Sequence, residues 1–187
     1  MNKIQVANIE NFWEAYDSKL EKGNHIVISD IDSVWFGGVF DPRSYISRFS
    51  TRRLYLMKKF QETTDFMLFT NRNLLGRWKG GYVDQVKANF SNVKVFNTSE
   101  EFLEKPDLNG FNLITNAQKP SPYSFEVLEL ALKRYTKVYY IAGREFPWTY
   151  KDEVLLKNLE EKEKELSEKV TFIDISKWML KNYQETT

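Results

Sequence analysis

The feature of this chain that most constrains its fold is a short apolar run that ends in two aspartates. Residues 25–29 have the length and composition of a buried strand, and Asp30 and Asp32 follow them, ahead of Gly37-Gly38. Because side chains alternate along an extended chain, the two carboxylates can project in the same direction. Open α/β sheets bind ligands beyond the carboxyl ends of their strands. The run therefore predicts an acidic site at the edge of a sheet.

Two later segments carry polar groups in similar positions. Residues 65–69 form a second apolar run of strand length, and Thr70 follows it with a hydroxyl that can donate to a phosphate oxygen. Lys119 lies just before residues 121–135, which have the apolar spacing of an amphipathic helix. An ammonium group in such a loop can reach an anion bound at the sheet edge.

In order and strand context, these residues resemble the motifs of the haloacid-dehalogenase-like superfamily of aspartate-nucleophile phosphatases. Asp30 and Asp32 match the first motif, Thr70 the second and Lys119 the third, and the resemblance spans roughly residues 25–155. It implies a Mg²⁺-dependent phosphomonoester hydrolase that works through an aspartyl-phosphate. Asp30 would be the nucleophile and Asp32 the general acid and base, while Lys119 and Thr70 would hold the phosphoryl group. The side chain of Asp30 and the carbonyl of Asp32 would bind Mg²⁺.

The fourth motif departs from the family pattern. After a strand at 137–142 and Gly143, the family usually places a metal-binding aspartate, whereas this chain has Arg144. Glu145 or Asp152 would then complete the Mg²⁺ site, directly or through water. Both are chemically allowed, because Mg²⁺ in proteins commonly keeps several of its bound waters. Alternatively, Arg144 supplies positive charge, and the chain binds a phosphorylated ligand or protein partner without turnover. Phosphoryl transfer to an acceptor other than water would use the same residues. The candidate substrate-binding residues are Asn71, Arg72 and Arg144.

The resemblance also implies a three-layer, doubly wound parallel α/β sheet, with a flap after the first strand and no full cap domain. We expect a single domain over residues 1–187, with an additional N-terminal helix at about 8–21. Strands and helices alternate along the chain, which is typical of a parallel sheet covered on both faces. The expected strands cover residues 25–30, 65–70, 93–98, 111–115, 137–142 and 170–175, and the other expected helices cover 44–62, 78–90, 99–104, 121–135, 149–169 and 176–183.

The composition excludes several classes of function. The chain has 27 basic and 26 acidic side chains, so its net charge of +1 gives no overall attraction to nucleic acid or an anionic membrane. It has no cysteine and one histidine, which excludes thiol catalysis and clustered zinc sites. We expect His25 to be a boundary or partly buried residue rather than a catalyst. Because no signal segment or long apolar run is present, we expect a soluble, cytoplasmic protein.

The short intervals between the motifs leave no room for a cap, so we expect an open site. In this family an open site tends to go with large substrates such as nucleic-acid ends or phosphoproteins, although small phosphate esters also fit. A basic set near the flap could border the site and meet a polyanion, with ordinary surface charge as the alternative. This set is Arg43, Arg48, Arg52, Arg53, Lys58 and Lys59.

Overall fold

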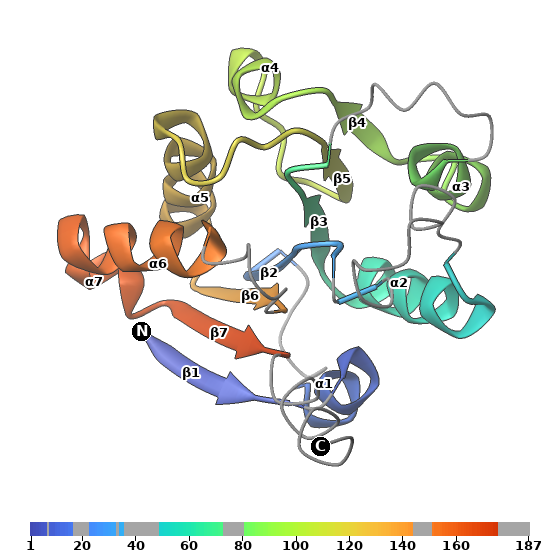
Figure 1. The fold of residues 1–187 in the computed structure, drawn as a ribbon, viewed down its shortest axis with the longest axis horizontal. Coiled ribbons are helices and arrows are strands. Elements are labelled where there is room, and N and C mark those ends of the chain that lie inside the picture. The colour runs from blue at the N-terminus through green and yellow to red at the C-terminus, as the bar shows by residue number, and fades with distance from the viewer. Residues whose placement is uncertain are drawn as a thin grey trace, which may run out of the picture.

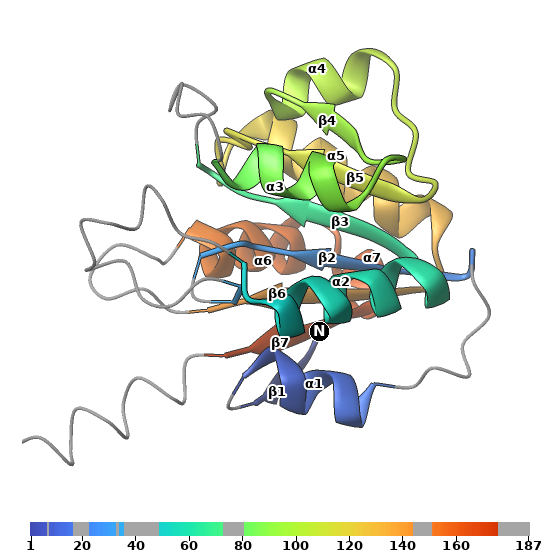
Figure 2. The same cartoon turned by 90° about the vertical axis from the view of Figure 1, so that its right-hand side faces the viewer.

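A parallel sheet organises the described part of the chain (Figures 1 and 2). The computed structural model describes residues 1–6, 8–16, 23–32, 34–35, 49–72, 81–143 and 151–175. The strand order is β1-β7-β6-β2-β3-β5-β4, and each neighbouring pair is parallel. The strands are β1 (Asn2–Gln5), β2 (His25–Ser29), β3 (Asp65–Phe69), β4 (Lys94–Phe96), β5 (Phe111–Ile114), β6 (Lys137–Ala142) and β7 (Val170–Asp174).

Helices cover both faces of this sheet, so the described part of the chain has three layers. Helices α1, α2 and α3 pack in one apolar cluster, and α4, α5, α6 and α7 pack in another on the opposite face. Figures 1 and 2 show the two sets on either side of the strands. The helices are α1 (Ile9–Ala15), α2 (Thr51–Thr63), α3 (Tyr82–Asn89), α4 (Ser99–Glu104), α5 (Pro122–Arg134), α6 (Lys151–Lys162) and α7 (Lys164–Ser167). The expected three-layer parallel α/β architecture is confirmed at this level.

The central strands β2 and β3 are mostly apolar and buried along their whole length, because both of their faces are covered. In β2, Val27 belongs to one cluster, and Ile26 and Ile28 belong to the other. The chain leaves β2 for β3 on one side and later returns to β6 on the other side. This reversal places a topological switch point between β2 and β6, where open α/β sheets bind their ligands.

Several predicted boundaries were wrong. Helix α2 begins at Thr51 rather than at 44, because the side chain of Ser50 caps it by accepting a hydrogen bond from the backbone of Arg53. The expected helix at 149–169 is interrupted at Glu163 and forms α6 and α7. Strand β1 was not predicted at all. Residues 36–40 of the expected flap and the expected helix at 176–183 lie outside the described residues.

His25 is a boundary residue of β2, as one of the two expected alternatives has it, and its side chain is completely buried. Its Nε2 atom contacts the hydroxyl of Tyr16, and its ring lies against Tyr16 and Tyr139. Helix α1 therefore covers the start of β2. None of the helices in the described segments is long and apolar enough to cross a bilayer.

Candidate functional site

The site begins where β2 ends. The backbone N–H of Asp30 donates to Ile141 O at 2.8 Å, so Asp30 continues the pairing of β2 with β6. Two hydrogen bonds through the Ser29 hydroxyl hold the turn beyond Asp30. Trp35 Nε1 donates to Ser29 Oγ, and Ser29 Oγ donates to Asp30 O, both at 2.8 Å. Asp30 is only 7% exposed. Its carboxylate is therefore held in a fixed place at the switch point.

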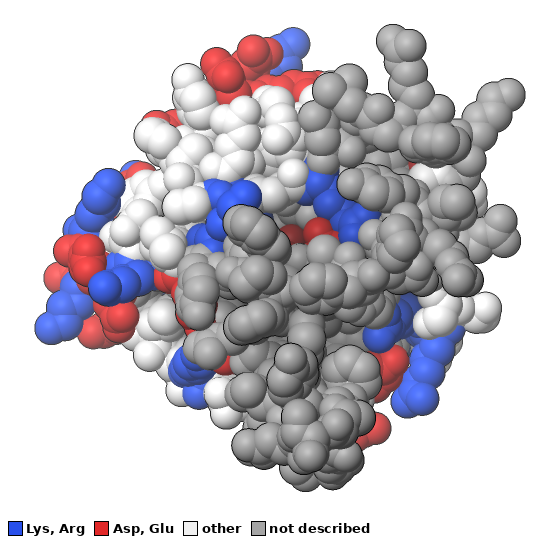
Figure 3. All heavy atoms as spheres, viewed as in Figure 1, with Lys and Arg blue, Asp and Glu red and all other residues white. Residues whose placement is uncertain are grey.

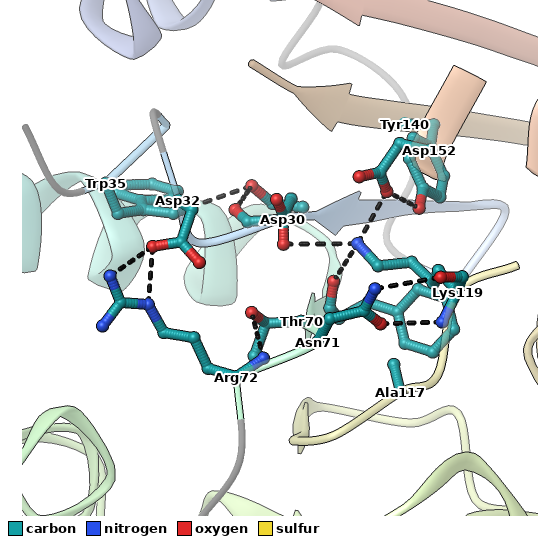
Figure 4. A network of polar contacts seen from close by, with 12 residues as sticks. Asp30, Asp32, Trp35, Thr70, Asn71, Arg72, Ala117, Lys119, Tyr140 and Asp152 are labelled. Atoms are coloured by element: carbon teal, nitrogen blue, oxygen red, sulfur yellow. Dashed lines mark hydrogen bonds and ion pairs between the residues drawn. The ribbon is translucent and has the colours of Figure 1, made fainter. Parts of the chain in front are cut away.

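Lys119 directs its ammonium group at Asp30 from the loop before α5 (Figure 4). Its Nζ lies 3.2 Å from Asp30 Oδ1, 2.6 Å from Asp152 Oδ1 and 2.8 Å from Phe69 O. A lysine ammonium has three donors, and each one here meets a protein oxygen. The side chain is 1% exposed. Lys119 is thus a buried cation that bridges the ends of β2 and β3 to the first turn of α6.

Asp152 reaches the site from the first turn of α6. Its Oδ1 atom accepts the Lys119 contact and also accepts a hydrogen bond from the hydroxyl of Tyr140 at 2.5 Å. Tyr140 lies on β6 and is completely buried. Asp152 therefore holds Lys119 in place together with Asp30, as Figure 4 shows.

Burial and charge together set the ionisation of this cluster. Burial, reinforced by Asp152 and Asp32 and opposed by Lys119, raises the pKa of Asp30 to about 7. Burial alone would lower the pKa of Lys119, but Asp152 and Asp30 together raise it above its usual value. Without a bound metal ion, burial thus favours the protonated form of the Asp30 carboxyl, while Asp152 and Asp30 favour the charged form of Lys119.

Thr70 follows β3 as predicted and is completely buried. Its hydroxyl accepts a hydrogen bond from the Arg72 backbone at 3.2 Å, and its backbone carbonyl accepts one from Ala117 N at 2.8 Å. The second contact ties the loop that carries Lys119 to the end of β3. Within that loop, Asn116 and Gln118 adopt positive φ angles of 41° and 56°, a backbone conformation that non-glycine residues seldom adopt.

The side chain of Asn71 pairs with the backbone of Lys119. Asn71 Nδ2 donates to Lys119 O at 3.0 Å, and Lys119 N donates to Asn71 Oδ1 at 2.7 Å. Both ends of the amide are engaged by one residue, so the described contacts of Asn71 position Lys119. Its predicted role in substrate binding stays a prediction.

Asp32 lies at the more open end of the site and pairs with Arg72. Arg72 Nε and Nη2 both lie 2.5 Å from Asp32 Oδ1. The two side chains are 21% and 18% exposed, compared with 1% for Lys119. The sequence motifs therefore do bring Asp30, Asp32, Thr70 and Lys119 to one region, with Arg72 beside them (Figure 4).

The described part of the site contains three carboxylates and two cations. The carboxylates are Asp30, Asp32 and Asp152, and the cations are Lys119 and Arg72. The excess negative charge and the oxygen donors suit a hard cation such as Mg²⁺, which proteins often hold with one or two carboxylates. No group of three or more acidic or histidine side chains among the described residues is placed to hold a metal. A metal here would depend on Asp30, the Asp32 carbonyl and residues beyond them.

Arg144 and Glu145 lie outside the described residues, as do Arg43 and Arg48 of the basic set. In the described part of that set, Arg53 donates to the Trp35 carbonyl beside the site, and Arg52 lies 4.0 Å from Glu10. Figure 3 shows acidic atoms near the centre of this face with basic side chains on either side.

Tyr140 was missed by the sequence reasoning, and so was the pairing of Ser29 with Trp35. The alternation of β6 places Tyr140 on the face packed by α6, but only the tertiary fold brings Asp152 to its hydroxyl. Comparison of the chain with profiles of known protein families, with curated proteins and with solved structures gave no match.

Proposed function

We propose that this protein is a Mg²⁺-dependent phosphomonoester hydrolase of the haloacid-dehalogenase-like type. The observation that carries the proposal is the contact between Asp30 and Lys119, 3.2 Å apart and both buried at the switch point of the sheet. A carboxylate in such a place can act as a nucleophile, and a fixed cation beside it can stabilise the charge of a transferring phosphoryl group.

The proposed reaction uses the two aspartates in sequence. An oxygen of Asp30 forms a bond to phosphorus while the bond to the leaving oxygen breaks, and Asp32 gives that oxygen a proton. Water then attacks phosphorus, passes a proton to Asp32 and releases Asp30 and inorganic phosphate. Lys119 and Thr70 hold the phosphoryl oxygens near Asp30. Mg²⁺, bound by the Asp30 side chain and the Asp32 carbonyl, would supply positive charge that favours the ionised form of Asp30.

Hydrolysis of an aryl phosphate in the presence of Mg²⁺ tests this proposal. We expect Asp30→Asn to abolish turnover, because an amide cannot form the acyl phosphate, and Asp32→Asn to slow it by a factor of about 10²–10⁴. Glu126→Gln, a matched change at an exposed carboxylate of α5, should leave turnover unchanged. Undiminished turnover by a folded Asp30→Asn protein would remove Asp30 from the reaction and the proposal with it.

A second candidate function is binding of a phosphorylated ligand without hydrolysis. Two observations favour it: each carboxylate of the described site already contacts a cation, and the described residues lack a three-carboxylate metal cluster. Arg144 in place of the expected aspartate adds to this case. Calorimetric titration with Mg²⁺ and with inorganic phosphate separates the two functions, because the binding module should take up phosphate without metal and turn over no phosphoester.

The proposed substrate is a phosphate on a macromolecule, because the chain has no room for a full cap. The position of Arg53 beside Trp35 would place positive charge of α2 next to such a substrate. Rates on a phosphorylated oligonucleotide, a phosphopeptide and small sugar phosphates should be compared at several salt concentrations. A strong preference for the sugars would contradict this choice, whereas a preference for the oligonucleotide should weaken as salt rises.

A further inference from the structure

The two cations of the described site differ in what a substrate can reach. All three donors of Lys119 contact protein oxygens, and its side chain is 1% exposed. A phosphoryl group can therefore gain the hydrogen bond from Lys119 that the proposed reaction requires only after it displaces one of these oxygens. Arg72 is 21% exposed and lies at the more open end of the site. A phosphate that approaches from solvent therefore meets Arg72 first.

The geometry of the Arg72–Asp32 ion pair is not the best match for a guanidinium group. Arg72 Nε and Nη2 both approach a single oxygen, Asp32 Oδ1. The guanidinium fork is best matched by two oxygens, one for each parallel N–H bond, and a phosphate group presents such a pair with a larger charge. Because both side chains are partly exposed, the ion pair is not protected from a competing anion.

The main chain of Arg72 is fixed by hydrogen bonds, whereas its side chain is partly exposed. Arg72 N donates to Thr70 Oγ1 at 3.2 Å, and Arg72 O accepts from Asn116 N at 2.7 Å and from the Tyr82 hydroxyl at 3.3 Å. The guanidinium can therefore change its acceptor without moving the end of β3 or the loop that carries Lys119. A side chain held in this way loses little backbone entropy on binding a ligand.

We propose that Arg72 is the phosphate-receiving residue of this site and that it exchanges Asp32 for two phosphate oxygens when the substrate binds. The exchange frees the Asp32 carboxylate only once a phosphate is in place. Substrate binding would thus be coupled to the availability of the group that transfers protons. This inference rests on the proposed function and names the residue that selects a phosphorylated ligand.

Inorganic phosphate binding, measured by calorimetry with and without Mg²⁺, tests the exchange directly. We expect Arg72→Gln to weaken phosphate binding about 10- to 100-fold, the loss of a charge-assisted hydrogen bond, and Arg72→Lys to weaken it less. Asp32→Asn should tighten binding, because it removes the negative charge that competes with phosphate for Arg72. That gain should be much smaller when Arg72→Gln is also present. Arg134→Gln, at an exposed arginine of α5 that contacts Asn109, is the matched control and should bind phosphate like the wild type.

Aryl phosphate turnover on the same preparations separates the inference from the function on which it rests. One outcome is that the wild type hydrolyses the ester while both Arg72 variants bind inorganic phosphate with the wild-type affinity. In that case the proposed exchange is wrong and the proposed function stands. An equal gain from Asp32→Asn with and without Arg72 would also overturn the exchange, since it would reflect only general charge repulsion. Wild-type protein that neither binds phosphate nor hydrolyses the ester overturns both. Circular dichroism confirms folding, and Arg72→Lys serves if Arg72→Gln does not fold.

Discussion

Lys119 lies closer to Asp152 than to Asp30, at 2.6 Å compared with 3.2 Å. Asp152, one of the two residues expected to complete a metal site, therefore contacts the lysine expected to hold the phosphoryl group. Because Asp152 Oδ1 also accepts the Tyr140 hydroxyl, this oxygen has two protein partners. The contacts favour a role for Asp152 in positioning Lys119.

The first prediction concerns the stability of this buried ion pair. Asp152→Ala should lower the free energy of unfolding by about 3–5 kcal/mol, because it leaves Lys119 buried with one carboxylate fewer. Tyr140→Phe should lower it by about 1–3 kcal/mol. Urea denaturation followed by circular dichroism measures both changes.

A matched tyrosine shows whether the effect belongs to the site. The Tyr135 hydroxyl is also buried and donates to Asp65 Oδ2 at 2.9 Å, at the opposite edge of the sheet. Tyr135→Phe should cost comparable stability and leave turnover unchanged, whereas Tyr140→Phe should lower turnover as well. Equal activities of the two folded variants would argue that Tyr140 has only a structural role.

The second prediction follows from the pKa of Asp30, which burial raises from 3.8 to about 7. Between these values the folded chain keeps a proton that the unfolded chain has released. The contribution of Asp30 to the free energy of unfolding is therefore complete below about pH 4. As the pH rises from there to about 7, this contribution falls by at most about 1.4 kcal/mol per pH unit, and above that range it is lost.

Denaturation in urea at a series of pH values, without Mg²⁺, measures this dependence. The difference in unfolding free energy between the wild type and Asp30→Asn should fall across that range and level off above it. Added Mg²⁺ should reduce the fall, because a bound cation favours the ionised carboxylate. A difference that stays constant with pH would mean that the Asp30 pKa is not raised.

Asn71 gives a third prediction, because its amide makes two hydrogen bonds with the Lys119 backbone. Asn71→Ala should lower the free energy of unfolding by about 1–3 kcal/mol and should lower kcat more than it changes KM, since Lys119 is no longer held. Asn89→Ala is the control, because its side chain makes an exposed contact within α3. A change in KM alone would instead indicate that Asn71 binds substrate.

The sequence predicts the elements of this fold where local signals agree with tertiary packing. The helix at 99–104 was predicted with its observed bounds, and Thr98 caps it by accepting a hydrogen bond from the Glu101 backbone. The break at Glu163 was missed, because Leu159 and Leu166 both pack in the same cluster and their spacing hides the interruption. Strand β1 consists of four exposed residues, and its one partner among the described strands is β7.

The site was predictable in its residues but not in its contacts. Strand ends could be located from apolar runs, so Asp30 and Thr70 could be placed at one edge of the sheet. The contact of Asp152 with Lys119 could not be predicted, because the two residues lie 33 positions apart and no local signal indicates the pairing. The same holds for the pairing of Arg72 with Asp32, which lie 40 residues apart. Long-range contacts of this kind decide whether a carboxylate binds a metal, a lysine or an arginine.

The last prediction concerns the metal. Because Asp152 Oδ1 is engaged by Lys119 and Tyr140, we expect Glu145 to be the carboxylate that completes the Mg²⁺ site. Glu145→Gln should then raise the Mg²⁺ concentration needed for half-maximal turnover more than Asp152→Asn does, while Asp152→Asn should cost more stability. Arg144→Asp should keep or tighten Mg²⁺ binding, because an oxygen ligand replaces a charge that repels the ion. Turnover that persists unchanged after chelation of divalent cations would exclude Mg²⁺ from the reaction.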